Sequence, residues 1–89
     1  MRYSLQVQKL LKTGSFTFGG RNYDVEVYAM GEGLDRDVQV TRAGRPIGPR
    51  YRVTFEVGFD LERHTGMDPV EELAKVAVEY VKSLPASMR

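Results

Sequence analysis

Apolar and polar residues alternate without interruption between positions 50 and 59. The odd-numbered positions are all aliphatic or aromatic: Tyr51, Val53, Phe55, Val57 and Phe59. The even-numbered positions are arginine, threonine, glutamate and glycine. A period of two is typical of a β-strand that buries one face. The pattern therefore predicts a strand over 50–59 whose apolar side faces the core.

Three other segments, 15–18, 22–30 and 37–41, repeat this alternation over shorter lengths. Within 22–30 the residues predicted to face inward are Tyr23, Val25, Val27 and Ala29. The connections between the segments are too short for the crossovers that parallel strands need. We therefore predict an antiparallel meander sheet with Tyr28 on its exposed face.

Beyond position 68 the apolar residues recur every three or four positions, as on one side of an α-helix. The resulting stripe consists of Val70, Leu73, Ala74, Ala77, Tyr80, Val81 and Leu84. Asp68 is a favourable N-cap, and Pro69 suits the first helical position because no backbone N–H is needed there. Pro85 then stops the helix. The sequence predicts an amphipathic C-terminal helix between Asp68 and Pro85.

The N-terminal segment 3–12 fits two patterns. Its first apolar residues alternate as in a strand, yet together with Leu10 and Leu11 they also have helical spacing. We interpret the segment as a short helix, because Ser4 can cap it and Gly14 can end it in the left-handed conformation. Adjacent leucines also suit a helix better than a two-faced strand.

These segments together predict a two-layer α+β domain that spans residues 1–89. An antiparallel meander sheet of roughly three to five strands forms one layer. The C-terminal helix, together with the short N-terminal helix, covers one face of that sheet. A chain of this size buries only about 60 to 65% of the surface that its unfolded form exposes, so the core is expected to be thin.

Composition narrows the chemistry and the expected location. The chain contains no cysteine, which excludes disulfides, thiolate nucleophiles and cysteine-ligated zinc. No long apolar run predicts a membrane span, and the first residues lack the pattern of a signal peptide. We therefore expect a cytoplasmic protein.

Positive charge is concentrated in one part of a nearly neutral chain. The formal net charge is +1, but the stretch 38–55 contains no acidic residue. Its basic residues are Arg42, Arg45, Arg50 and Arg52. A near-zero total argues against a broad nucleic-acid footprint but allows a local one.

The four arginines differ in how easily the chain itself can neutralise them. Arg50 and Arg52 share the outer sheet face with acidic residues of the neighbouring 22–30 segment, so cross-strand pairs can form. Arg42 and Arg45 lie near the tip of a loop, which we expect Pro46 and Pro49 to keep out of the sheet. They are therefore better candidates for contact with a partner.

We interpret the chain as a non-enzymatic accessory or regulatory module that binds a larger protein with an acidic surface. The predicted contact residues are Arg42, Arg45, Arg50, Arg52 and Tyr28. Exposed sheet edges also permit a homodimer by strand pairing. The alternative is a small nucleic-acid-binding domain that places the same arginines on phosphates, although no zinc finger, RNP1 sequence or KH loop accompanies them.

Two other groups of residues predict neither catalysis nor metal binding. Asp60, Glu62 and His64 would share a face only if a strand continued through them, and a single histidine without cysteine selects metal ions poorly. The acidic residues at 32–37 do not have the spacing of an EF-hand loop. We therefore predict no catalytic residue, no metal site and no cofactor.

Overall fold

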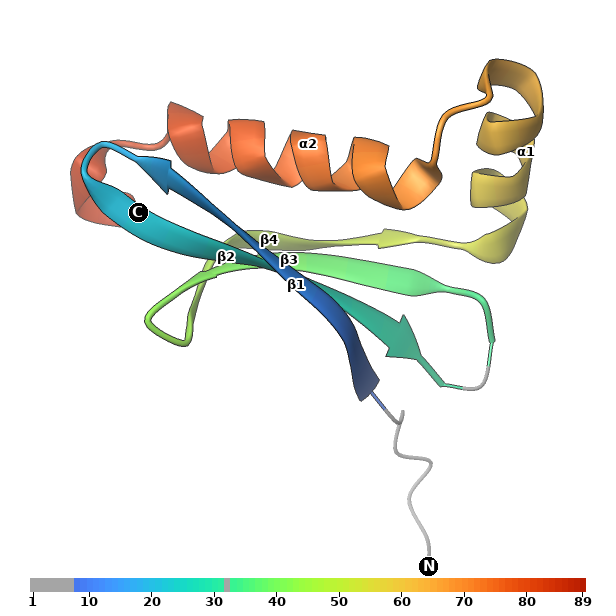
Figure 1. Ribbon diagram of the computed structural model, residues 1–89, viewed down its shortest axis with the longest axis horizontal. Helices are drawn as coiled ribbons and strands as arrows, with labels where there is room; N and C mark the ends of the chain where they lie inside the picture. Colours follow the sequence, from blue (N-terminus) through green and yellow to red (C-terminus); the bar gives the residue numbers. More distant parts are fainter. Residues whose placement is uncertain (1–7, 32) are drawn as a thin grey trace, which may run out of the picture.

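Four antiparallel strands form a meander sheet in the order β1-β2-β3-β4, and two α-helices follow them in the chain (Figure 1). The elements are β1 (Gln8–Phe18), β2 (Arg21–Met30), β3 (Arg36–Arg42), β4 (Arg45–Val53), α1 (Phe55–Thr65), α2 (Pro69–Ser83) and the short 3-10 helix η1 (Ala86–Met88). This computed structural model describes residues 8–31 and 33–89. The predicted α+β class, the meander and the C-terminal helix are confirmed.

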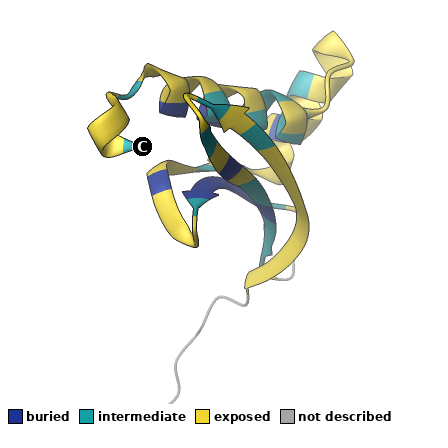
Figure 2. Ribbon diagram, turned by 60° about the vertical axis from the view of Figure 1, so that its left-hand side comes forward, coloured by how far each residue is buried: buried dark blue, intermediate teal, exposed yellow. Residues whose placement is uncertain are grey.

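The core lies between the sheet and α2, which packs mainly over β3 and β4. Its buried apolar side chains are Tyr23, Val27, Val38, Val40, Ile47, Ala77 and Val81. Figure 2 shows that burial is concentrated at the centre of the sheet and under α2, whereas most of α1 is exposed. Within the described residues, large hydrophobic side chains that are exposed outnumber those that are buried. A small domain with so much apolar surface has room for contacts with other molecules.

The caps of α2 agree with the sequence-based prediction. The Asp68 carboxylate accepts hydrogen bonds from the backbone N–H groups of Val70 at 2.8 Å and Glu71 at 3.4 Å. Pro69 occupies the first turn, and the helix ends at Ser83, before Pro85. These interactions lie within a few residues of the helix ends, so they could be recognised from local sequence.

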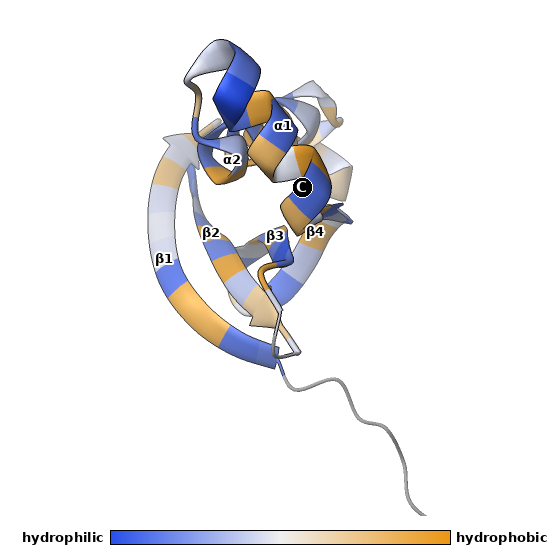
Figure 3. Ribbon diagram, turned by 90° about the vertical axis from the view of Figure 1, so that its right-hand side faces the viewer, coloured by the Kyte–Doolittle hydropathy of each residue, from blue (hydrophilic) through white to orange (hydrophobic). Residues whose placement is uncertain are grey.

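The predicted N-terminal helix is wrong from residue 8 onward, because Gln8–Phe18 forms β1; residues 1–7 of that prediction lie outside the described residues. β1 pairs with β2 from Gln8 opposite Met30 to Phe18 opposite Arg21. A bulge between Leu10 and Lys12 accommodates the adjacent leucines and accompanies the curvature of β1 in Figure 3. Ladder hydrogen bonds to β2 therefore override a weak local preference for helix.

The predicted strand over 50–59 is correct only as far as Val53. Thr54 caps α1 with its hydroxyl, which accepts a hydrogen bond from the N–H of Val57 at 3.4 Å. The carboxylate of Asp35 accepts a second one from the N–H of Phe55 at 3.1 Å. Gly66, with a φ of 72°, ends the helix and donates its N–H to the carbonyl of Glu62. Capping at both ends thus makes 55–65 helical.

Phe55, Val57 and Phe59, which alternation placed in the core, are instead 49%, 63% and 53% exposed on α1. Phe55 and Phe59 are four positions apart, so they lie on one side of the helix with ring centroids 5.9 Å from each other. A period of two and a spacing of four coincide at these positions. The two phenylalanines were therefore consistent with a helix as well, whereas Val57 fits the alternation alone.

Replacing Val57 by alanine is expected to change the free energy of unfolding by less than about 0.5 kcal/mol, because the side chain is exposed. The same substitution at Val38, which is 0% exposed, is expected to cost about 2 kcal/mol through lost burial and a cavity. Urea denaturation of both variants measures the two changes in the free energy of unfolding. Equal losses would mean that Val57 faces a core, as the alternation predicted.

Candidate functional site

The turn between β3 and β4 presents two of the predicted arginines. Ala43 and Gly44 form a two-residue connection with φ angles of 52° and 79°, and positive values at both positions characterise a type I′ hairpin. Arg42 and Arg45 lie directly opposite each other across it. The segment from Arg45 onward is therefore a strand and not the predicted loop.

Pro46 and Pro49 were predicted to keep this segment out of the sheet, which is wrong. Both prolines belong to β4, where Pro46 lies opposite Thr41. β4 is an edge strand, so one of its sides has no ladder partner in the described part of the chain, and the missing N–H groups are tolerated there. The prolines make this edge a poor template for further strand pairing.

Two locally unfavourable features coincide at the β3–β4 turn. Like charges that face each other across strands repel, and Arg42 and Arg45 form such a pair. Ala43 has a left-handed backbone that costs a residue with a Cβ about 1 kcal/mol. In residues 8–31 and 33–89, no carboxylate oxygen lies within 4.0 Å of either guanidinium group. Among these residues, therefore, no direct ion pair offsets this charge.

Replacing Ala43 by asparagine, which tolerates the left-handed region, is expected to raise the free energy of unfolding by about 0.5 to 1 kcal/mol. Replacing it by valine should lower stability by more than about 1 kcal/mol, because a β-branched side chain is strained at positive φ. Thermal and urea denaturation of the two variants measure these opposite shifts. Shifts in the same direction would contradict the left-handed conformation.

The other two arginines bind one buried carboxylate. Nε of Arg50 lies 2.8 Å from Oδ2 of Asp37, and Nε of Arg52 lies 2.6 Å from Oδ1 of the same residue. Asp37 is only 3% exposed. Cross-strand neutralisation of Arg50 and Arg52 was expected from acidic residues of 22–30, but the partner lies on β3, which is the strand adjacent to β4.

Arg50 and Tyr28 continue this network across the outer sheet face. The guanidinium carbon of Arg50 lies 4.5 Å from the ring centroid of Tyr28, and its Nη2 donates to Oε1 of Gln8 at 2.6 Å. The Tyr28 hydroxyl donates to Oε1 of Glu26 at 2.7 Å. That hydrogen bond is the main reason why the pKa of Tyr28 lies above its ordinary value. Arg50, Arg52 and Tyr28 therefore already make internal polar contacts, whereas neither arginine of the turn forms an ion pair with another described residue.

Sequence reasoning missed the roles of Asp37 and Gln39. Gln39 is 7% exposed and donates from Nε2 to the carbonyls of Gly48 at 3.2 Å and Val40 at 3.1 Å. The first contact satisfies a backbone carbonyl where the β3–β4 register shifts. Gly48 and Pro49 directly precede the strand predicted from residue 50, and a glycine in a strand often indicates a bulge, so this pair could have revealed the irregularity.

Lowering the pH is expected to remove the stabilisation that Asp37 provides. Burial raises the pKa of its carboxyl, but hydrogen bonds from Arg52 and Arg50 outweigh burial, so the pKa lies below its ordinary value. Such a group stabilises the fold fully above its unfolded pKa of about 3.9 and loses this effect as the pH falls towards the folded value. Urea denaturation at several pH values should show the stability difference between wild type and Asp37→Asn narrowing below about pH 4. A difference that stays constant in acid would contradict this linkage.

The remaining candidates for chemistry are dispersed. His64 lies exposed in the last turn of α1, with Nδ1 2.8 Å from the carbonyl of Asp60. Of the acidic residues at 32–37, Asp35 and Asp37 make the contacts described above, and Glu32 lies outside the described residues. In the part of the chain that the structure describes, no three histidine, aspartate or glutamate side chains are grouped so that they could hold a metal ion.

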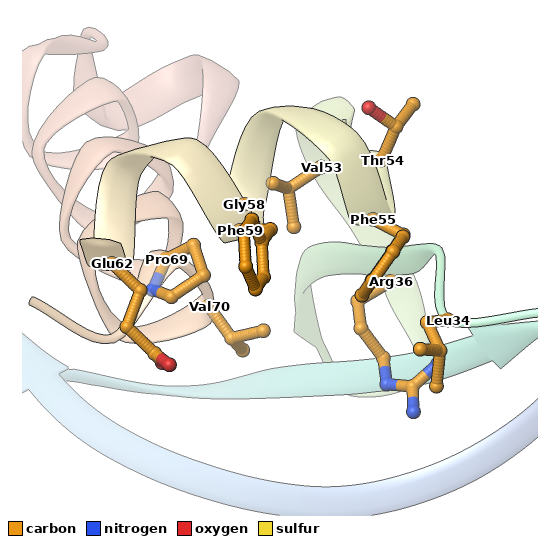
Figure 4. Close-up of a pocket in the computed structure, with 10 residues that line it drawn as sticks. All are labelled: Leu34, Arg36, Val53, Thr54, Phe55, Gly58, Phe59, Glu62, Pro69 and Val70. Carbon is orange, nitrogen blue, oxygen red and sulfur yellow. The ribbon is translucent and has the colours of Figure 1, made fainter. Parts of the chain in front are cut away.

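A cavity of about 170 Å³ lies between α1 and the start of α2 (Figure 4). Its walls are mainly the apolar side chains of Phe55, Phe59 and Val53, while Arg36 and Glu62 lie at opposite ends. Arg36 donates to the carbonyl of Asp35 at 2.9 Å. The lining contains neither a histidine nor a nucleophile with a base beside it, so it presents no catalytic constellation.

Comparison of the chain with protein-family models, curated proteins and solved structures produced no match. None of the helices in the described ranges has the length and apolar character required to cross a membrane. Function must therefore be inferred from the surface that the fold presents.

Proposed function

We propose that this protein is a non-enzymatic accessory or regulatory module that binds an acidic surface of a larger protein through Arg42 and Arg45. The observation that carries the proposal is the direct opposition of these arginines across a turn with a left-handed alanine. Local rules broken without internal compensation tend to mark functional sites. Two guanidinium groups held on a tight hairpin suit bidentate contacts with carboxylates.

A protein partner fits this surface better than nucleic acid does. Arg50 and Arg52, which the nucleic-acid hypothesis also needs, are bound to Asp37. Two remaining arginines neutralise about two phosphates, which corresponds to a salt slope of only about −1.8.

The test compares wild type with an Arg42→Glu/Arg45→Glu variant in a pull-down from the source cell. The matched control is Lys9→Glu/Arg63→Glu, which makes the same change in net charge at two exposed positions away from the turn. We expect wild type and control to capture a protein that the hairpin variant does not. Titration calorimetry with the purified partner should then show binding to the wild type that weakens with salt and with the hairpin substitutions.

Two results would overturn the proposal. Equal capture and equal affinity of the hairpin variant would remove Arg42 and Arg45 from the interface. In a gel-shift assay at low salt, the wild type could instead retard duplex or single-stranded DNA or RNA while the hairpin variant does not. That result would support the nucleic-acid alternative. Circular dichroism of each variant verifies that the fold is retained.

A further inference from the structure

A lateral stripe along α2 flanks the side of the helix that packs on the sheet, and Ala74 and Val78 are its only partly buried members. It lines a shallow depression of about 430 Å³ and consists of Glu71, Ala74, Lys75, Val78, Glu79 and Lys82. Their spacing follows i, i+3, i+4, i+7, i+8 and i+11, so all six lie on one side of the helix. Ala74 and Val78 provide an apolar centre, and charged side chains flank it along its length.

A groove of about 320 Å³ between α2 and β1 continues this stripe. Ala74 and Val78 line both depressions, and Phe16, Val25 and Val27 line the sheet side of the groove. α2 packs mainly over β3 and β4, so it leaves much of the helix-facing side of β1 open. An apolar sheet surface beside an open helix flank is typical of a site that another helix covers.

The charges of the stripe are self-complementary. From the N-terminal to the C-terminal end of α2 they read acidic, basic, acidic, basic, at Glu71, Lys75, Glu79 and Lys82. When a second copy of the helix runs antiparallel, its order is reversed and each charge meets its opposite. Glu71 then lies beside Lys82 of the second copy, and Lys75 lies beside Glu79 of the second copy. Only an identical chain is certain to provide this matching order.

We propose that the protein forms a two-fold homodimer in which the α2 helices of two copies pack antiparallel along this stripe. Ala74 of one copy lies against Val78 of the other, and four intermolecular ion pairs flank these contacts. Lys75 binds Glu72 of its own helix at 2.9 Å, but its side chain is 74% exposed, so it can exchange partners at little cost. The stripe shares no residue with the β3–β4 turn, so the dimer does not depend on the hairpin's function.

Sedimentation equilibrium of three variants tests this dimer. Lys75→Glu/Lys82→Glu makes the stripe entirely acidic, and Glu71→Lys/Glu79→Lys makes it entirely basic. We expect the wild type to be dimeric and each variant alone to dissociate, with a dimer dissociation constant raised at least about tenfold by lost pairs and new repulsion. An equimolar mixture of the two variants should form a heterodimer, and Lys9→Glu/Arg63→Glu should dimerise like the wild type.

A cysteine cross-link provides a second measurement that does not alter charge. The chain has no cysteine, so any disulfide in an Ala74→Cys/Val78→Cys variant comes from these positions. We expect rapid formation of a covalent dimer under mild oxidation and slow formation for Glu62→Cys/Arg63→Cys on α1. The proposal would be overturned by a monomeric wild type, by a mixture without heterodimer, or by equal cross-linking rates. It would also be overturned if the charge variants dimerised normally, which is the result expected for a dimer formed through a sheet edge.

Discussion

Replacing Asp37 by alanine is expected to lower the free energy of unfolding by about 2 to 4 kcal/mol. The substitution leaves Arg50 and Arg52 beside each other without the carboxylate that both contact at 2.8 and 2.6 Å. Breaking a buried pair costs more than making it gains, because the remaining charges stay partly desolvated. The arginine side chains are 33% and 42% exposed, which permits some rehydration, so the expected loss is smaller than for a fully buried triad. Urea denaturation at neutral pH measures the loss.

Asp24 provides the matched control for this experiment. It lies on the same outer face, one strand away, but is exposed and makes none of the ion pairs found among residues 8–31 and 33–89. Asp24→Ala is expected to change stability by less than about 0.5 kcal/mol. Similar losses for the two substitutions would show that Asp37 contributes no more than an ordinary surface carboxylate.

Replacing Gly48 by alanine is expected to cost about 2 to 3 kcal/mol, the second large effect that the structure predicts. Gly48 has a φ of 77°, a conformation that strains residues with a Cβ. An ideal Cβ at this position would lie 2.9 Å from Cδ1 and 3.1 Å from Cε1 of Tyr80. Both the backbone and the ring of Tyr80 must therefore adjust. Chemical denaturation of the variant measures their combined cost.

Two comparisons separate these contributions. Gly14→Ala is the control, because Gly14 lies in β1 with no atom within 4 Å of an ideal Cβ, and alanine there should be neutral or stabilising by up to about 1 kcal/mol. In a Tyr80→Ala background, Gly48→Ala should retain only the backbone part of its cost, about 1 kcal/mol. An effect of Gly48→Ala as small as that of Gly14→Ala would contradict the irregular β3–β4 register.

The elements predicted most accurately are those whose signals are local. Asp68, Pro69 and Pro85 delimit α2 through interactions with the helix ends, and all three act as the sequence predicts. The inward residues of β2 and β3 were also recognisable, because Tyr23 and Val27 in β2, and Val38 and Val40 in β3, occupy the alternate positions that a half-buried strand requires. The arginines of the hairpin were identified for a comparable reason, since an acid-free stretch can be read directly from the chain.

The errors occur where distant residues select between two local possibilities. The spacing of Phe55 and Phe59 suits a helix as well as a strand, and Asp35, twenty positions earlier in the chain, accepts a hydrogen bond from the first turn of the helix. Gln8–Gly14 could be helical by spacing, but its pairing with β2 makes it a strand. In both segments tertiary contacts add free energy to what local propensity supplies, and in α1 they add to the local caps at Thr54 and Gly66.

The amino-acid sequence alone determined the α+β class, the meander and the position of α2, because periodicity and capping act between residues close together in the chain. Only the tertiary structure decided which arginines are neutralised. Strand register places Asp37, and neither Asp24 nor Glu26, against Arg50 and Arg52, and it leaves Arg42 and Arg45 opposite each other at the turn. Ion pairing depends on the distance between two charged groups in space, and strand pairing sets that distance.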